Sequence, residues 1–117
     1  SLLYHIWQLK RAGRLSSIPI YLDSPMAISA SDLFCDNPTD HRLPSASCRA
    51  LCEVATYARD VAESKAISAS RFPKVVVAAS GMASGGRVLH HLKTFAPDHR
   101  NTILFAGYQA DGTRGRR

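Results

Sequence analysis

Three short segments of the chain combine glycine with hydroxyl-bearing residues in a way that suits phosphate binding. They are Asp23-Ser24-Pro25, the run from Ser80 to Gly86, and the run from Gly107 to Thr113. Each follows an apolar stretch that is typical of a strand. Where such a turn leads into a helix, unpaired backbone N–H groups and the positive end of the helix dipole attract anions.

The middle segment is the richest of the three. Gly81, Gly85 and Gly86 have no Cβ, so a sugar-phosphate backbone can approach the main chain there. Arg87 follows directly and can donate a charge-assisted hydrogen bond. We interpret Ser24 and Ser80 as helix-capping or phosphate-contacting residues. A tight turn between a strand and a helix would also explain these glycines, so the spacing alone does not establish a ligand.

Several other chemistries are disfavoured by the motifs. The glycine-rich run lacks the Lys and Ser/Thr of a P-loop and does not match the dinucleotide fingerprint. The sequence has no Gly-x-Ser-x-Gly, His-Glu-x-x-His or His-x-His-x-Asp-His pattern. His90 and His91 are neighbours on a predicted helix and point about 100° apart, so we expect one at the edge of the core and one in solvent. For the remaining histidines, His5, His41 and His99, we expect surface positions.

The chain has three cysteines, Cys35, Cys48 and Cys52, which cannot all pair in disulfides. An odd number favours a reducing compartment and buried thiols. With His41 they could supply four zinc ligands, but a structural zinc site usually has two closely spaced ligand pairs, and only one is present.

Strands and helices alternate around these segments. We predict strands over Ile18–Leu22, 56–59, Lys74–Ala79 and Thr102–Ala106, the second of them weak. We predict helices over 1–10, 25–34, 47–54, 62–70 and 88–95, with a loop from Asp36 to Ser47. In the last helix Val88, Leu89, Leu92 and Phe95 mark one apolar face. This order predicts a three-layer α/β/α domain with a mainly parallel sheet.

Length and composition fit one globular domain spanning residues 1–117. With 45% hydrophobic and 21% charged residues, the chain is not expected to be disordered. No apolar run is long enough for a membrane span, so we expect a cytoplasmic protein. Fifteen basic against nine acidic residues give a net charge of +6, which favours an anionic partner such as nucleic acid.

Taken together, four segments make the chain resemble a known family. They are Ile-Pro-Ile-Tyr-Leu-Asp-Ser-Pro-Met-Ala, Glu-Ser-Lys-Ala from Glu63, the run from Val76 to Leu92, and Gly-Tyr-Gln-Ala-Asp-Gly-Thr-Arg-Gly from Gly107. The sequence is similar to the β-CASP domain of metallo-β-lactamase-fold RNA-processing nucleases, and within them to bacterial relatives of the pre-mRNA 3′-end cleavage factor subunit. The likeness extends over Ile18–Asp32 and Val61–Arg117. The chain then corresponds to a fragment truncated at both ends, without the metallo-β-lactamase domain.

The resemblance implies a role in positioning RNA. In the family this domain caps a site with two zinc ions in the metallo-β-lactamase domain, and single-stranded RNA runs between the two domains. The chain itself carries no metal ligands or catalytic residues of that site, so it should be inactive alone. The resemblance implies contacts to the RNA backbone from residues in the first two turns: Ser24, Ser80, Gly81, Met82, Ser84, Gly85, Gly86 and Arg87. It places Tyr108, Gln109 and Thr113 near the domain junction.

Two alternatives stay open from the sequence. The same turns would serve a non-catalytic module that binds nucleic acid or a nucleotide. The second alternative is a fragment that self-associates through the surface normally covered by the missing domain.

Overall fold

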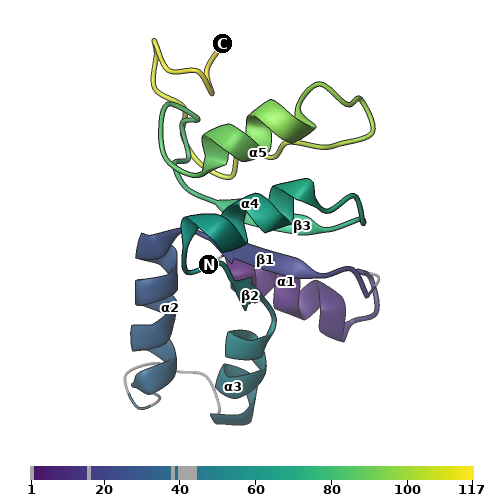
Figure 1. Ribbon diagram of the computed structural model, residues 1–117. Coiled ribbons are helices and arrows are strands. Elements are labelled where there is room, and N and C mark those ends of the chain that lie inside the picture. Colours follow the sequence, from purple (N-terminus) through teal and green to yellow (C-terminus); the bar gives the residue numbers. More distant parts are fainter. Residues whose placement is uncertain (1, 16, 38, 40–44) are drawn as a thin grey trace.

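The computed structural model of the protein describes residues 2–15, 17–37, 39 and 45–117. This part of the chain holds five helices and three strands (Figure 1). In chain order they are α1 (Leu2–Arg11), β1 (Ile20–Asp23), α2 (Pro25–Asp36), α3 (Ser45–Glu53), β2 (Thr56–Tyr57), α4 (Val61–Ala69), β3 (Val75–Ala78) and α5 (Val88–Phe95). The alternation confirms the predicted α/β class. Half of the predicted loop from Asp36 to Ser47, His41 included, lies outside the described residues, and the prediction is wrong at 45–47, which belong to α3.

The strands form one parallel sheet with the order β2-β1-β3. Tyr21 pairs with Thr56 on one side of β1, and Asp23 pairs with Ala78 on the other. Because all three strands run in the same direction, their carboxyl ends meet at one edge of the sheet. The turns that follow β1, β2 and β3 therefore share that edge.

The core is centred on β1, the middle strand. Ile20 and Leu22 are buried, and they alternate with Tyr21 along the strand. Ile28 of α2 and Ile67 of α4 are also buried. Burying both faces of a short middle strand requires apolar side chains, and the Ile-Pro-Ile-Tyr-Leu sequence supplies them.

Local hydrogen bonds fix where α4 begins and ends. Asp60 accepts a hydrogen bond from the backbone N–H of Glu63, and the Glu63 carboxylate accepts one from the N–H of Arg59 at 2.6 Å. The first bond uses an amide that a helix start leaves unpaired, and the second ties the residue before the cap to the first turn of α4. At the other end of α4, the Lys74 ammonium donates to the carbonyls of Ile67 and Ser70, and burial lowers the pKa of Lys74.

The predicted strand over Thr102–Ala106 is wrong. The segment makes no strand ladder, and its apolar side chains Ile103, Leu104 and Phe105 are exposed. β3 consequently forms one border of the sheet among the described residues. A strand needs a paired neighbour as well as β-favouring side chains, and local sequence reports only the second requirement.

Two further expectations need correction. Cys35 of α2 and Cys52 of α3 form a disulfide, so these two are not free thiols and are not zinc ligands. On α5, the four residues of the predicted apolar face are only half-buried, and the buried residue is His91. The disulfide links two helices whose sequences gave no direct signal of their contact.

No helix in the described part of the chain is long and apolar enough to cross a membrane.

Candidate nucleic-acid interface

Two of the three turns singled out by their composition lie side by side at the carboxyl edge of the sheet, and the third, which follows no strand, packs on the second. β1 and β3 are neighbours, so the Ser24 turn and the Ser80–Gly86 turn are adjacent. The C-terminal segment packs on the second turn, where the side-chain amide of Gln109 donates to the Gly81 carbonyl at 2.8 Å. The Gly115 N–H donates to the Met82 carbonyl at 2.9 Å.

This edge is also a topological switch point. The chain leaves β1 toward β2 on one side and later returns to β3 on the other side. In parallel α/β sheets the loops diverge at such a point, and ligands bind in the crevice outside the strand ends. The turns after β1 and β3 flank this position.

The first turn starts helix α2. Ser24 is buried, its backbone is extended, and its hydroxyl oxygen accepts a hydrogen bond from the Ala27 N–H at 3.2 Å. Pro25 occupies the first helical position, where its missing N–H has no consequence. The capping interpretation of Ser24 is therefore confirmed, while its phosphate contact stays a prediction.

The second turn leaves several backbone N–H groups without a partner, and Gly81, Ser84 and Gly86 in it are exposed. Among the described residues, no partner accepts a hydrogen bond from the N–H groups of Gly81, Met82, Ser84, Gly85 and Gly86. A Cβ added at Gly81 or Gly85 would meet no atom within 4 Å. The surface of the turn therefore has both donors and space.

Gly86 is required by the fold itself. Its φ is +76°, and a Cβ there would lie 3.3 Å from the Ala79 carbonyl oxygen. The turn is closed by hydrogen bonds from Ala83 to Ser80 and from Val88 to Ala79. Ser84 donates its hydroxyl to the Met82 carbonyl and is exposed.

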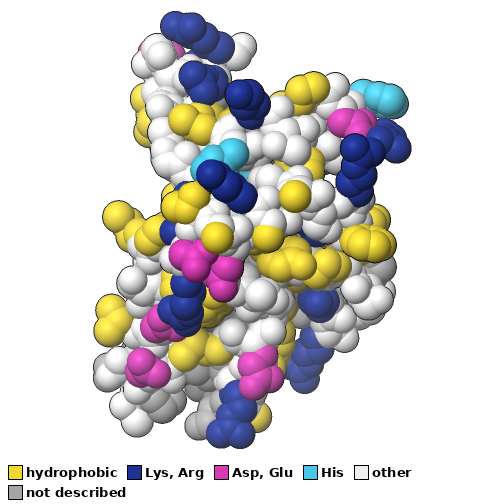
Figure 2. All heavy atoms as spheres, viewed as in Figure 1, with side chains coloured by type: hydrophobic (Ala, Val, Ile, Leu, Met, Phe, Trp, Pro, Cys, Tyr) yellow, Lys and Arg dark blue, Asp and Glu magenta, His cyan; other side chains and the backbone are white. Residues whose placement is uncertain are grey.

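In the third turn, the residues expected near a domain junction have local partners. Gln109 is tied to the second turn, and Thr113 donates its hydroxyl to the Ala110 carbonyl at 2.6 Å. Tyr108 is 79% exposed. Lys and Arg side chains gather over the C-terminal segment, at the top of Figure 2. A junction role for these three residues is untested.

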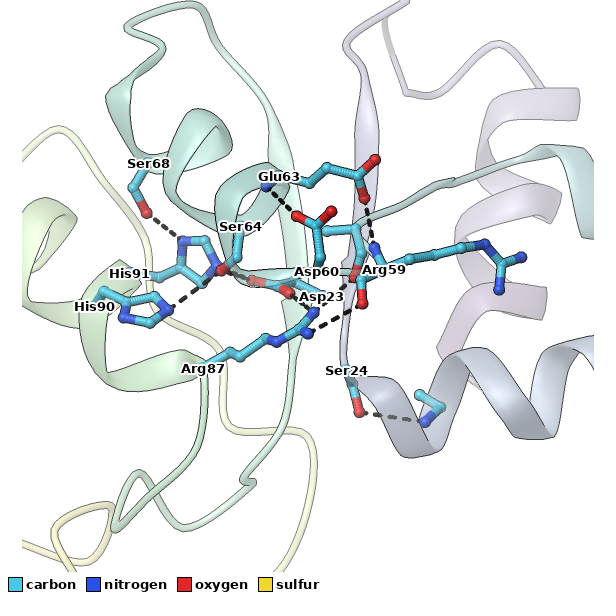
Figure 3. Close-up of polar contacts among 12 residues, drawn as sticks. Asp23, Ser24, Arg59, Asp60, Glu63, Ser64, Ser68, Arg87, His90 and His91 are labelled. Carbon is cyan, nitrogen blue, oxygen red and sulfur yellow. Dashed lines mark hydrogen bonds and ion pairs between the residues drawn. The ribbon is translucent and has the colours of Figure 1, made fainter.

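Asp23 is the centre of a buried polar cluster directly beside the turns (Figure 3). Its side chain is fully buried at the end of β1. Arg87 donates to Oδ1 at 2.9 Å, and the His91 Nε2 lies 2.5 Å from Oδ2. The Ser64 hydroxyl also donates to Oδ2.

The hydrogen-bond pattern assigns the protons of the cluster. A carboxylate only accepts, so His91 donates to Asp23 from Nε2, and its Nδ1 lies 2.7 Å from the hydroxyl oxygen of Ser68. Ser64 gives its one proton to Asp23, so it accepts from His90 Nε2 at 3.2 Å. His91 is buried and His90 half-buried. The expected core-edge histidine is His91, but His90 contacts Ser64 rather than solvent alone.

The cluster keeps Asp23 ionised. Burial is the largest single influence on this carboxyl and opposes its ionisation. The three donated hydrogen bonds together outweigh burial, so the pKa of Asp23 lies below its ordinary value of 3.8.

Arg87 has more contacts than its sequence position suggested. Its guanidinium donates to the Ala58 carbonyl at 2.7 Å and to the Arg59 carbonyl at 3.2 Å, in addition to Asp23. The side chain is 16% exposed. Three of its five N–H groups are thus used within the described residues, and two are left for another acceptor.

Sequence reasoning missed Asp23, Ser64 and Ser68 as site residues and predicted an ordinary role for His91. An acidic residue at the end of a buried apolar strand was the one available signal. Among the described residues no group of three or more His, Cys, Asp or Glu side chains could hold a metal ion. The zinc ions implied by the resemblance therefore have no ligand set in this part of the chain.

Comparison with known proteins places the chain in a family. The Beta-Casp domain model matches residues 1–117. Ribonuclease TTHA0252 of Thermus thermophilus is 40% identical over 111 residues, covering 87% of this chain and 25% of the relative. Transcription termination factor FttA of Methanosarcina mazei is 60% identical over 45 residues, covering 38% of this chain and 7% of the relative.

The FttA of Methanocaldococcus jannaschii is 43% identical over 67 residues, covering 57% of this chain and 11% of that protein. The chain therefore spans a quarter or less of the length of these relatives. The fold class, the quoted turns and the match over the whole chain agree, and the chain belongs to the Beta-Casp domain family.

Proposed function

We propose that the chain is the RNA-positioning domain of a metallo-β-lactamase-fold ribonuclease. In this proposal the turns at the carboxyl edge of the sheet bind successive phosphates of a single-stranded RNA. The domain is inactive alone. Two zinc ions in the metallo-β-lactamase domain of the longer protein would supply the hydrolytic chemistry, and no step of it is assigned to this chain.

The observation that carries the proposal is the open backbone of the second turn. Five N–H groups between Gly81 and Gly86 have no partner in the described chain, and they lie just before the N-terminus of α5. Donors of this kind, with the positive end of a helix dipole, bind phosphate. The absence of a Cβ at Gly81 and Gly85 leaves room for the phosphate oxygens.

Charge and relatives support a nucleic-acid ligand over a small anion. The chain carries a net charge of +6, and Lys and Arg side chains gather over the segment that packs on the second turn (Figure 2). Ribonuclease TTHA0252 is a ribonuclease by name. The cytoplasmic location that suits an RNA ligand stays a prediction.

The proposed RNA-phosphate ligands are those expected from the sequence: Ser24, Ser80, Gly81, Met82, Ser84, Gly85, Gly86 and Arg87. The backbone amides of the second turn carry most of the binding. Ser24 can donate its hydroxyl proton because capping of α2 uses only its oxygen as an acceptor. Arg87 can reach a phosphate only with the two N–H groups that its buried contacts leave over.

Fluorescence anisotropy with a short labelled single-stranded RNA tests the proposal. We expect the chain to bind with an affinity that falls steeply as salt rises, because phosphates release counterions on binding. Gly81→Ala should lower the affinity about tenfold, since a Cβ in the open space displaces a phosphate from donors worth about 1.5–3 kcal/mol each. The circular dichroism spectrum and the urea midpoint of Gly81→Ala should match those of the unsubstituted chain.

Two controls complete the experiment. Arg100→Gln removes one exposed positive charge away from the turns and should change RNA affinity by less than about twofold. Adding zinc to the chain with RNA should produce no cleavage. RNA affinity unchanged by Gly81→Ala would contradict the proposed site, and zinc-dependent cleavage that persists through repurification would contradict the assignment of catalysis to another domain.

A further inference from the structure

We infer that Asp23 is a positioning residue that sets the geometry of the phosphate-binding turns through Arg87. The inference rests on the proposed function, because it concerns how the same turns are held. Asp23 is the last residue of β1 and immediately precedes Ser24. It is therefore fixed by the sheet on one side and by the start of α2 on the other.

The side-chain contacts of Asp23 reach two helices and the residue that follows the glycine-rich turn. Ser64 comes from α4 and His91 from α5, and both donate to the same carboxylate oxygen. Arg87 directly follows the glycine-rich turn and donates to the other carboxylate oxygen. One carboxylate thus joins the end of the middle strand to two helices and one turn, as Figure 3 shows.

Arg87 carries this constraint into the second turn. Its planar fork makes three directed bonds, to Asp23, to the Ala58 carbonyl and to the Arg59 carbonyl. The turn is anchored at its start by β3, and the side chain of Arg87 anchors its end against β1 and the loop after β2. The N–H groups between these anchors lack partners within the described chain, so their direction depends on both anchors and on the bonds that Ala83, Gln109 and Gly115 make to carbonyls of the turn.

The loop that accepts from Arg87 is itself held by hydrogen bonds at the start of α4. The Arg59 N–H donates to the Glu63 carboxylate, and Asp60 caps α4. The acceptor carbonyls at Ala58 and Arg59 are thus held by a helix start, and they point to a fixed place. A guanidinium suits this arrangement, whereas an ammonium could not make all three bonds in the same plane.

The cluster also contains a Ser68–His91–Asp23 line, the order of groups found in nucleophilic catalysis. Ser68 lies inside α4, where backbone amides are used in the helix, so no pair of free amides can stabilise an oxyanion beside it. The line is therefore a set of structural hydrogen bonds, and it fixes the ring of His91 against β1.

RNA binding by substituted chains separates positioning from simple charge. Asp23→Asn and Asp32→Asn each remove one negative charge, but Asp32 lies in an exposed pair with Arg59. On charge alone both changes should strengthen RNA binding. We expect Asp23→Asn to weaken it about tenfold and Asp32→Asn to leave it unchanged or slightly stronger.

The salt dependence and a double substitution test whether Asp23 acts through Arg87. Asp23→Asn should leave the slope of log affinity against log salt unchanged, since no phosphate contact of a cation is removed. Arg87→Lys should lose nearly as much affinity as Arg87→Gln, because the fork rather than the charge is needed. The Asp23→Asn/Arg87→Gln chain should lose no more than the worse single substitution.

A measurement without RNA makes failure of the inference distinguishable from failure of the proposed function. In nuclear magnetic resonance spectra of the free chain, Asp23→Asn should shift the amide signals of residues 81–86, and Asp32→Asn should not. If the parent binds no RNA, the proposed function fails while this arm still tests positioning. If Asp23→Asn does not fold, Ser64→Ala takes its place in these experiments. It removes only one donor to Asp23 and should give smaller effects of the same sign.

Unshifted turn amides in Asp23→Asn, or RNA affinity equal to that of Asp32→Asn, would overturn the inference. Additive losses in the double substitution would also overturn it, because they would mean that Asp23 and Arg87 act independently.

Discussion

Replacing Asp23 by Asn should be among the more destabilising substitutions in this domain. The carboxylate is fully buried and ion-paired with an Arg87 side chain that is 16% exposed. Removing one partner of a buried ion pair costs about 3–5 kcal/mol. Asn keeps the shape and one acceptor oxygen, and His91 can change tautomer to meet its NH2 group. We therefore expect a loss at the lower end, about 3 kcal/mol.

That loss is large for a chain of this size. A stability of about 0.05–0.15 kcal/mol per residue gives about 6–18 kcal/mol for the whole domain. An unfolding entropy of about 2.1 cal/mol/K per residue converts a loss of about 3 kcal/mol into a fall in Tm of about 12 °C. Urea denaturation followed by circular dichroism at pH 7 measures the free energy directly.

Asp32→Asn is the matched control. It breaks an ion pair whose side chains are 59% and 44% exposed, and such pairs contribute about 0–1 kcal/mol. If Asp23→Asn loses no more free energy of unfolding than Asp32→Asn, the buried cluster does not hold the fold as described.

The pH dependence has a definite sign. The pKa of Asp23 in the folded chain lies below the ordinary 3.8, so ionised Asp23 stabilises the fold above about pH 4. This contribution is lost as pH falls through the folded pKa. The difference in stability between the parent and Asp23→Asn should therefore be full at pH 7 and shrink below about pH 4; a difference that grows in acid would contradict the assignment.

Three further predictions follow from single contacts. Ser24→Ala should lower the free energy of unfolding by about 1 kcal/mol because it removes the α2 cap, and it should also lower RNA affinity by removing the hydroxyl proton offered to a phosphate; unchanged affinity would count against Ser24 as a ligand. Gly86→Ala should destabilise the fold by about 1–2 kcal/mol in urea denaturation, since its φ is +76°, while Gly85→Ala should cost less than about 0.5 kcal/mol. Equal losses would refute the described turn. Reducing the Cys35–Cys52 disulfide opens a loop with a sequence separation of 17 and should lower the free energy of unfolding by about 3 kcal/mol, whereas an identical urea curve with reductant would show that the bond contributes nothing.

Most of the elements and their order were predictable because their signals are local. Ser24 and Pro25 mark the start of α2 by capping chemistry, and the apolar Ile-Pro-Ile-Tyr-Leu run marks a buried strand. Once strands and helices alternate, a parallel sheet follows, and parallel strands bring their carboxyl ends to one edge. The sequence therefore predicts that the first two turns lie close together.

The buried cluster around Asp23 could not be predicted from the sequence, because its members are distant in the chain. His91 lies 68 positions from Asp23, and Arg87 lies 64 positions from it. The sequence predicts that one of His90 and His91 lies at the edge of the core, but it gives no sign of the carboxylate that His91 contacts. The buried contacts of Arg87 were missed for the same reason, since its acceptors come from the end of β1 and from the loop after β2.

The segment Thr102–Ala106, which was predicted to be a strand and is not one, shows that a local signal can also mislead. Its β-favouring side chains are real, yet Leu104 is 76% exposed and the segment pairs with no strand in the described chain. Intrinsic preference for extended backbone decides little unless a sheet edge accepts the segment. The Cys35–Cys52 bond likewise depends on how α2 and α3 pack, which spacing along the chain does not determine.

Mapping RNA onto the chain by amide chemical shifts tests the central claim most directly. Titration with a short single-stranded RNA should shift the backbone amides of residues 80–87 and those next to Ser24, and leave α1 and the far end of the sheet unchanged. Shifts confined to α1 or to the exposed Ile103–Phe105 segment, with the glycine-rich turn unaffected, would contradict it.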